Sequence, residues 1–168
     1  MVKIWDKGNS IDKKIEQFTV GDDFIIDQEL VQYDCEASIA HVKMLKKIGI
    51  LSASEEKNLI KELQKISQEH KQGKFIISIE DEDCHTAIEN RLIKSLGDTG
   101  SKIHTGRSRN DQVLVALRLY YKSSLSEISS ITNQCVEHLQ MFGDNNNFDF
   151  PGYTHMQKAM PSNIKMWS

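Results

Sequence analysis

Apolar residues recur at helical spacing between residues 24 and 49. The stripe is formed by Leu30, Tyr33, Ala37, Ala40, Val42, Leu45 and Ile48. This spacing follows the helical period, and the two lysines before Gly49 suit the negative end of a helix dipole. The pattern predicts a helix that stops at Gly49, because glycine commonly terminates helices.

Two shorter helices are predicted next. Ser52 and Glu55 have the spacing of a capping box, and the helix that they start is expected to end at Gly73. Its apolar face consists of Leu59, Leu63 and Ile66. Residues 75–79 (FIISI) form a short, isolated apolar run, which favours an extended connector over a strand. Residues 81–97 are acidic at the start and end in glycine, and they predict the third helix.

The longest periodic segment extends from about residue 107 to residue 142. Its stripe consists of Val113, Leu117, Tyr121, Leu125, Ile128, Cys135, Leu139 and Phe142. An average helix has only about 11 to 12 residues, and the frequent serines and threonines of this segment lower its helix propensity. A helix of this kind needs neighbours that hold it, as in a large helical bundle.

The end of the chain predicts a loop and a further helix. Residues 148–155 (FDFPGYTH) are interpreted as a short loop, and Pro161 fits the first turn of a helix whose apolar pattern has only begun at Ser168. The fold is therefore expected to be all-α. A helical N-terminal domain over residues 1–105 precedes the incomplete start of a long-helix bundle over residues 106–168, as in a piece of a longer protein.

Composition and charge narrow the function classes. Charged residues make up 27% and apolar residues 39% of the 168 residues, which supports a packed core. The net charge of −3 argues against a nucleic-acid partner, which usually requires a basic surplus. Three scattered cysteines are typical of reduced thiols in a cytoplasmic protein. No apolar run has the length of a signal peptide or a membrane span, so no membrane partner is expected.

The first window with candidate chemistry is residues 80–92 (EDEDCHTAIENRL). His85 follows four acidic residues and opens the third predicted helix. Its imidazole has the chemistry to bind a substrate carboxylate. It can equally pair with Asp81 or Asp83, since carboxylates near a helix start need no functional reason. Taken alone, the window leaves both interpretations open.

The second window is residues 101–113 (SKIHTGRSRNDQV), which starts the longest predicted helix. Its donors for an anionic ligand are Arg107, Arg109 and Asn110. Backbone N–H groups at a helix start add a positive field. The alternative is a capped helix start, with Ser108 as the N-cap, Asp111 three residues later and arginines in solvent. These residues alone do not decide between the two.

The third window is residues 151–161 (PGYTHMQKAMP). Thr154 and His155 directly follow Pro-Gly, and a histidine on a rigid loop suits acid–base chemistry near neutral pH. The alternative is a buried histidine whose nitrogens are satisfied by the backbone. No Cys/His spacing predicts a metal site, and no phosphate-binding or dinucleotide-binding glycine motif occurs. We therefore expect no metal and no cofactor.

Taken in this order, the three windows resemble argininosuccinate lyase, a family of the fumarase/aspartase superfamily. HTGRSRNDQV is the most discriminating stretch, and the resemblance extends from Trp5 to the end of the chain. It implies reversible β-elimination of argininosuccinate to arginine and fumarate, in arginine biosynthesis. A base removes a proton beside a carboxylate, and an acid protonates the departing guanidinium nitrogen. It also implies a homotetramer with a central bundle, in which each site draws residues from three subunits.

The resemblance also assigns roles to single residues. It implies that His155 is the catalytic acid–base histidine, with Thr154 beside it as a catalytic and substrate-binding residue. Asn110 contacts the substrate, while Arg109 and His85 line the site. Arg107 and Ser108 are weaker candidates, which are expected to position the loop.

Two departures from the family pattern are visible. Members often begin W-G-G-R-F and have a substrate-binding serine shortly afterwards, whereas this chain begins with WDKGNS and has Gly21 near that serine's place. A backbone N–H of Gly21 would have to replace the hydroxyl. The family's mobile loop, G-S-S-x-M-P-x-K-x-N, supplies a catalytic serine and has no counterpart in these 168 residues. The 168 residues alone are therefore expected to be inactive.

Two other classes of function remain as alternatives. One is a non-catalytic structural homologue on the lyase fold, which the absence of the serine loop from the full gene product would favour. The other is a small helical module that binds phosphates through its arginines and whose affinity falls steeply with salt. The net charge of −3 and the lack of a basic helix face argue against this second alternative.

Overall fold

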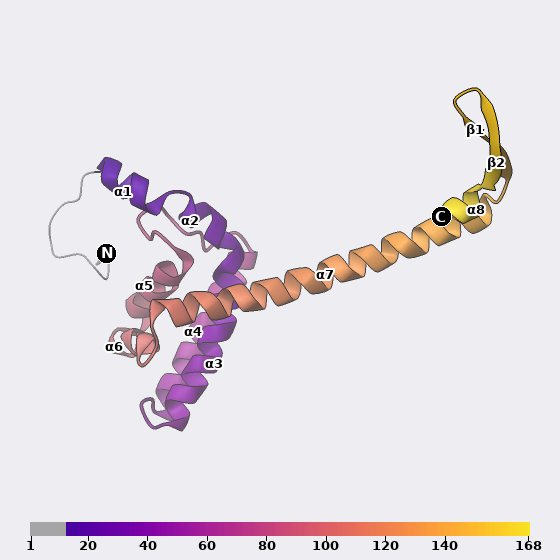
Figure 1. Ribbon diagram of the computed structural model, residues 1–168. Helices are drawn as coiled ribbons and strands as arrows, with labels where there is room; N and C mark the ends of the chain where they lie inside the picture. Colours follow the sequence, from indigo (N-terminus) through magenta and orange to yellow (C-terminus); the bar gives the residue numbers. More distant parts are fainter. Residues whose placement is uncertain (1–12) are drawn as a thin grey trace. The chain divides into compact units, whose positions relative to one another are not determined.

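The computed structural model describes residues 13–168, so the unusual start WDKGNS lies outside the described residues (Figure 1). The first elements are α1 (Lys13–Val20), α2 (Asp23–Ile26), the 3-10 turn η1 (Asp27–Leu30), α3 (Val31–Lys47), α4 (Ala53–Lys71), α5 (Cys84–Leu96), α6 (Asp98–Ser101) and the 3-10 turn η2 (Lys102–His104). They are followed by the long helix α7 (Arg109–Asn145), the strands β1 (Asp149–Thr154) and β2 (Gln157–Asn163), and the short helix α8 (Ile164–Trp167). Within the described residues, no helix is both long and apolar enough to cross a lipid bilayer.

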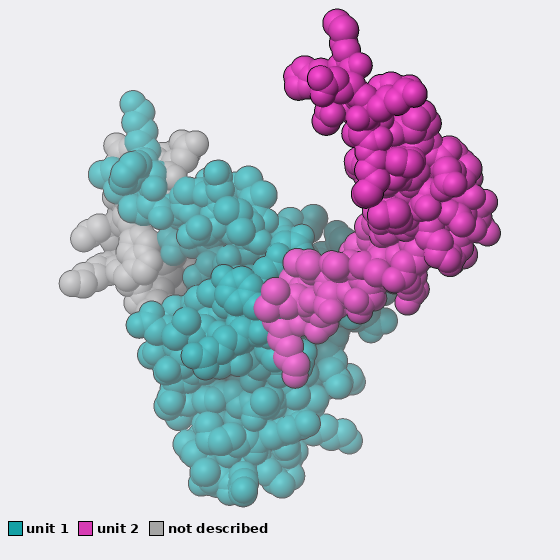
Figure 2. Space-filling model, turned by 45° about the vertical axis from the view of Figure 1, so that its right-hand side comes forward, with its two compact units in different colours: residues 1–121 teal, residues 122–168 magenta. Residues whose placement is uncertain are grey.

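The chain forms two compact units, residues 1–121 and residues 122–168, and the division falls inside α7 (Figure 2). The domain boundary expected after residue 105 stays a prediction. The all-α class is confirmed, with one small two-stranded sheet as its exception.

The core of the first unit lies between α3, α4 and α5. Its fully buried side chains include Val42, Leu45, Leu59, Leu63, Ile66 and Leu92. Burying each side chain of this size stabilises the folded state by about 1.5 to 3 kcal/mol before entropy is subtracted. At the edge of this core, Arg91 of α5 donates to Glu62 and Glu69 of α4 at 3.2 and 2.9 Å, which ties the two helices together.

The predicted helix ends of this unit are largely confirmed. Ser52 and Glu55 form the capping box at the start of α4, where Ser52 Oγ accepts from the Glu55 N–H at 3.3 Å. Gly49 follows the last residues of α3 with φ of +83°, a backbone conformation that favours glycine. Residues 75–79 form no strand, as expected of a connector.

The face of α3 that is buried differs from the predicted apolar stripe. Its buried residues are Val31, Asp34, Cys35, Ser38, Val42 and Leu45. Ala40 and Ile48, both assigned to the apolar face, are exposed. The buried face includes Asp34 and Ser38, because polar side chains from other parts of the chain form hydrogen bonds with them in the core. A prediction from apolar spacing alone leaves such polar positions out.

The second unit corrects the prediction for the end of the chain. Instead of a loop followed by a helix at Pro161, β1 and β2 pair in an antiparallel hairpin, and the last helix begins only at Ile164. The ladder is irregular between Phe150 and Gly152, where the two prolines, which have no N–H to donate, are accommodated. A Cβ atom at Gly152 would collide with the carbonyl oxygen of Met160, so glycine allows the strands to approach each other.

Few contacts hold the second unit together. The Phe150 and Trp167 rings lie 6.4 Å apart between centroids, and Trp167 Nε1 donates to Ser162 Oγ at 2.7 Å. Lys165 Nζ lies 2.8 Å from Asp144 Oδ1, and this carboxylate raises the pKa of Lys165. These contacts attach α8 to the end of α7 and to β2.

Candidate functional site

His85 is buried at the start of α5 in the first unit. Its side chain is 2% exposed, and Nδ1 lies 3.1 Å from Asp34 Oδ2 on α3. Although the two atoms are close, they do not form a hydrogen bond, and Nδ1 has no hydrogen-bond partner among the described residues. The alternative pairing with Asp81 or Asp83 is therefore wrong. Asp83 instead caps α5, where it accepts from the Thr86 N–H at 2.6 Å.

Asp34 is the centre of a buried polar cluster. Its carboxylate is fully buried and accepts from Gln112 Nε2 of α7, at 3.1 Å through Oδ1 and 2.9 Å through Oδ2. Ser38 Oγ, one turn later on α3, donates to Oδ1 at 3.3 Å. Helices α3, α5 and α7 therefore meet at one carboxylate. This degree of hydrogen bonding is what a buried charge requires.

Arg107 joins this cluster from the turn before α7. Its Nη1 donates to Ser38 Oγ at 3.2 Å. Burial lowers the pKa of Arg107, and the negative charge of Asp34 opposes that shift. Arg107 therefore anchors the turn to α3, in agreement with the expectation that it positions the loop.

Arg109, the first residue of α7, points its guanidinium to groups on α5 and α7. Nη1 donates to Gln112 Oε1 at 3.1 Å, and Nη2 donates to Thr86 Oγ1 at 3.4 Å. The same Nη2 lies 3.6 Å from Glu89 Oε2. Since the side chain is 26% exposed, part of this cation remains accessible to a ligand.

The start of α7 is capped as the alternative interpretation of the second window predicts, and the anion-binding interpretation stays a prediction. Ser108 Oγ accepts from the Asp111 N–H at 3.2 Å, and Asp111 Oδ2 accepts from the Ser108 N–H at 3.0 Å. These hydrogen bonds lower the pKa of Asp111 and form a capped helix start. Beside the cap, Asn110 is exposed and Arg109 is half-buried. The cap therefore fixes the place from which both side chains extend.

Gly21 lies between α1 and α2, away from this cap in the sequence. It is exposed and has φ of +54°. Glycine suits this backbone conformation, so the presence of a glycine at this position is explained without a ligand. Its role as a substitute for a substrate-binding serine stays a prediction.

Thr154 and His155 belong to the second unit. Thr154 ends β1, and His155 is the first residue of the hairpin turn, with φ of +53°. Both are exposed, so the alternative of a buried histidine satisfied by the backbone is wrong. A non-glycine residue rarely adopts a positive φ, and such conformations occur often at functional sites. The structure thus brings His85, Arg109 and their partners together in one unit and presents Thr154 and His155 on the other.

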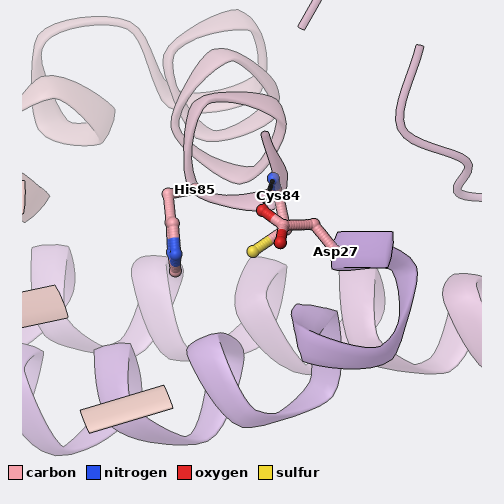
Figure 3. A group of neighbouring side chains, drawn as sticks. All are labelled: Asp27, Cys84 and His85. Atoms are coloured by element: carbon pink, nitrogen blue, oxygen red, sulfur yellow. Dashed lines mark hydrogen bonds between the residues drawn. The ribbon is translucent and has the colours of Figure 1, made fainter. Parts of the chain in front are cut away.

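Asp27, Cys84 and His85 form the one group among the described residues whose ligand atoms could surround a metal ion, all within 4.8 Å of one another (Figure 3). Figure 3 shows Asp27 reaching from η1 toward the start of α5, with the Cys84 sulfur between Asp27 and His85 in this view. Burial raises the pKa of the Cys84 thiol, and nearby carboxylates add to the effect. Asp27 Oδ2 instead accepts from the Cys84 N–H at 3.2 Å, which caps α5. The group therefore has a structural explanation, and we assign no metal to it.

Three residues of the buried polar cluster around Asp34 were not predicted from the sequence: Asp34, Ser38 and Gln112. Gln112 lies inside the second window but was not singled out, since a glutamine on a helix is usually exposed. Asp34 lies one turn after Val31 and one turn before Ser38, on the same buried face as Val42 and Leu45 of the predicted stripe. The signal in the sequence was that Asp34 stands at helical spacing from apolar positions that are buried.

Comparison with known proteins places the chain in a family. A family model described as "Lyase" matches residues 7–168. Three similar proteins are named argininosuccinate lyase, and each covers nearly all of this chain. That of Thermotoga neapolitana is 48% identical over 167 residues, which are 99% of this chain and 42% of that protein.

The other two relatives show the same relation. The protein of Xylella fastidiosa strain Temecula1 is 45% identical over 166 residues, 98% of this chain and 37% of that protein. That of Sorangium cellulosum is 42% identical over 168 residues, 99% of this chain and 39% of that protein. The chain thus spans about two-fifths of the length of these relatives. It belongs to the lyase family of the fumarase/aspartase superfamily.

Proposed function

We propose that the whole protein is an argininosuccinate lyase, which reversibly eliminates fumarate from argininosuccinate and leaves arginine. The observation that carries this proposal is the start of α7. There Arg109 and Asn110 extend beside a capped helix N-terminus, and the buried Gln112 and the half-buried Thr86 hold the guanidinium. Identities of 42 to 48% to proteins named argininosuccinate lyase, over nearly the whole chain, support it.

In this proposal, the first unit binds the substrate carboxylates. Arg109 offers a planar pair of donors that matches a carboxylate, and Asn110 offers an amide donor. The positive field of the α7 N-terminus favours the same anion. Negative charge grows on the carboxylate when the neighbouring carbon loses its proton, so these donors act more strongly in the transition state than in the ground state. His85 lines this wall, and the Gly21 N–H is the proposed replacement for a hydroxyl.

The second unit supplies the proposed acid–base group. His155 is exposed, and an imidazole can both accept and donate a proton, which is what the elimination requires of its acid–base group. Thr154 precedes it on β1 and contributes a hydroxyl to the substrate. The turn fixes the backbone of His155, which reduces the entropy lost when the imidazole meets the substrate.

We also propose that the whole protein is a homotetramer in the cytoplasm. In the second unit, α7 exposes a series of large apolar side chains, namely Leu125, Ile128, Ile131, Val136, Leu139, Met141 and Phe142. An apolar surface of this kind marks an interaction site. Cys35, Cys84 and Cys135 are free thiols, which supports a reducing compartment. Because the chain spans about two-fifths of its relatives, the 168 residues alone are proposed to be inactive.

The test is fumarate formation from argininosuccinate by the full-length protein, followed by ultraviolet absorbance. His155→Ala is expected to lower kcat by about a hundredfold or more, because positioned acid–base groups contribute on that order. Lys158→Gln, which replaces an exposed cation of the same hairpin, is the control and is expected to keep kcat.

Two results would contradict the proposal in different ways. Absence of fumarate with the unsubstituted full-length protein would refute the lyase activity. A loss of less than about tenfold in His155→Ala would leave the activity in place and refute the role of His155.

A further inference from the structure

A fully buried carboxylate is rare in a protein core unless it has a specific partner, and Asp34 has several. Both of its oxygens accept from the same amide nitrogen, Gln112 Nε2. Asp34 lies on α3 and Gln112 on α7, which are 78 residues apart in sequence. The contact therefore fixes the start of α7 against α3 more specifically than apolar packing does.

This contact also determines which way the Gln112 amide points. A carboxylate oxygen accepts hydrogen bonds, whereas the two ends of an amide differ, since the nitrogen donates and the oxygen accepts. With the opposite orientation, Gln112 Oε1 would face the carboxylate as acceptor against acceptor. Asp34 therefore holds Nε2 inward and leaves Oε1 directed away from it.

The outward Oε1 is the atom that Arg109 uses. Arg109 Nη1 donates to Gln112 Oε1 at 3.1 Å, while the longer contacts of Nη2, 3.4 Å to Thr86 Oγ1 and 3.6 Å to Glu89 Oε2, leave the guanidinium less well fixed on that side. Three side chains thus form a connected series from the core to the start of α7. Its last member is a partly exposed cation.

We propose that Asp34 is a positioning residue that acts through the Gln112 amide to hold the Arg109 guanidinium in place for a substrate carboxylate. This inference rests on the proposed function, in which Arg109 binds the substrate. Asp34 is fully buried, so it acts on a bound substrate through its neighbours, and Gln112 is the neighbour that also holds Arg109.

A double-mutant cycle separates positioning from plain structural support. Asp34→Asn keeps the size of the side chain, but it offers Gln112 Nε2 one acceptor oxygen in place of two, and its own amide nitrogen opposes the second contact. If Asp34 acts through Arg109, the loss caused by Asp34→Asn disappears once Arg109 is already alanine. If Asp34 only supports the fold, the two losses add.

The experiment measures kcat/KM for argininosuccinate with four full-length proteins: unsubstituted, Asp34→Asn, Arg109→Ala and the double variant. Asp34→Asn is expected to lower kcat/KM by about tenfold or more, and to change it by less than about twofold in the Arg109→Ala background. Additive losses would overturn the inference. Glu62→Gln, which removes a carboxylate bound to Arg91 outside this series, is the control and is expected to keep kcat/KM.

Two further measurements keep the result decisive. If Asp34→Asn does not fold, Gln112→Met interrupts the same series with Asp34 in place, and the same cycle is run with it.

Fumarate binding to each variant is also measured by calorimetry. The inference is supported, even without turnover, if Asp34→Asn weakens fumarate binding and this difference is absent in the Arg109→Ala background. An inactive unsubstituted protein would refute the proposed function, whereas unchanged fumarate binding in Asp34→Asn would refute the inference.

Discussion

The two units of the chain use their apolar side chains in opposite ways. All the buried apolar side chains of the described residues precede residue 122, and those of α3, α4 and α5 form one core. In residues 122–168 the large apolar side chains are exposed or half-buried, and Met156 is 98% exposed. The first unit therefore has a core of its own, whereas the second unit exposes an apolar surface of the kind that marks interaction sites.

The candidate site is divided in the same way. In the first unit, Arg109 is held by hydrogen bonds that reach the core. In the second, His155 is held by the backbone of a hairpin turn. Arg109, the proposed binding group, is thus fixed within its own unit, and His155, the proposed acid–base group, is exposed on the second unit.

The largest effect is expected for Asp34→Ala in the first unit. Removing the carboxylate leaves two buried donors, Gln112 Nε2 and Ser38 Oγ, without their acceptor. Each buried donor left without a partner costs about 1 to 3 kcal/mol, so the free energy of unfolding is expected to fall by about 2 to 6 kcal/mol. Urea denaturation of the 168-residue chain, followed by circular dichroism, measures this change. A loss below about 1 kcal/mol would show that the cluster does not stabilise the unit.

A pair of leucines tests the comparison between the units directly. Leu63 is fully buried in the first unit and Leu125 is 65% exposed in the second. Leu63→Ala is expected to lower the free energy of unfolding by about 2 to 5 kcal/mol, because it leaves a cavity. Leu125→Ala in the same 168-residue chain is expected to change it by about 0.5 kcal/mol or less. Equal losses would mean that the second unit has a core of its own.

In the full-length protein, the result for Leu125 is expected to differ. If α7 joins a bundle, Leu125→Ala removes buried contacts between chains. The proposed tetramer is then expected to dissociate at a higher protein concentration in this variant than in the unsubstituted protein, as measured by analytical ultracentrifugation. Unchanged assembly would show that this part of α7 faces solvent in the whole protein.

Ser52→Ala is expected to have a smaller effect, limited to the start of α4. The substitution removes the Oγ that accepts from the Glu55 N–H. Loss of an N-cap costs about 0.5 to 2 kcal/mol. Urea denaturation checks the value, and Lys57→Ala, at an exposed position of the same helix, is the control.

The smallest effect is a pH dependence at the same cap. The hydrogen bond from Lys102, with further ones from Ser52, lowers the pKa of Glu55 from an ordinary 4.5 to about 2. A carboxylate with a lowered pKa stabilises the folded state above its unfolded pKa, and this stabilisation is lost as the pH falls from 4.5 toward 2. The urea midpoint is expected to fall over that range, and by less in Glu55→Gln. Equal pH dependence in both proteins would exclude this role of Glu55.

The local features of the fold were predictable because short stretches of sequence determine them. A serine three residues before a glutamate predicts the cap of α4, and Gly49 predicts the end of α3. Both rest on backbone hydrogen bonds within a few residues. The three windows were likewise visible as runs of neighbouring polar residues.

Features that depend on distant residues were not predictable in this way. Asp34 is buried because Gln112, 78 residues later, donates to it, and no local pattern contains that information. The hairpin at β1 and β2 was missed because Pro161 fits the first turn of a helix as well as an irregular strand. Pairing across the turn decided between them, and pairing is a tertiary property.

The central claim is the proposed function, in which Arg109 binds the substrate and His155 is the acid–base group. The most direct measurement mixes two inactive full-length variants, Arg109→Ala and His155→Ala, unfolds and refolds them together, and follows fumarate formation. If each site combines units from different chains, some mixed tetramers contain an intact Arg109 and an intact His155 in one site. The account predicts that the mixture regains activity that neither variant shows after the same treatment alone. A mixture that forms mixed tetramers and remains as inactive as its components would contradict it.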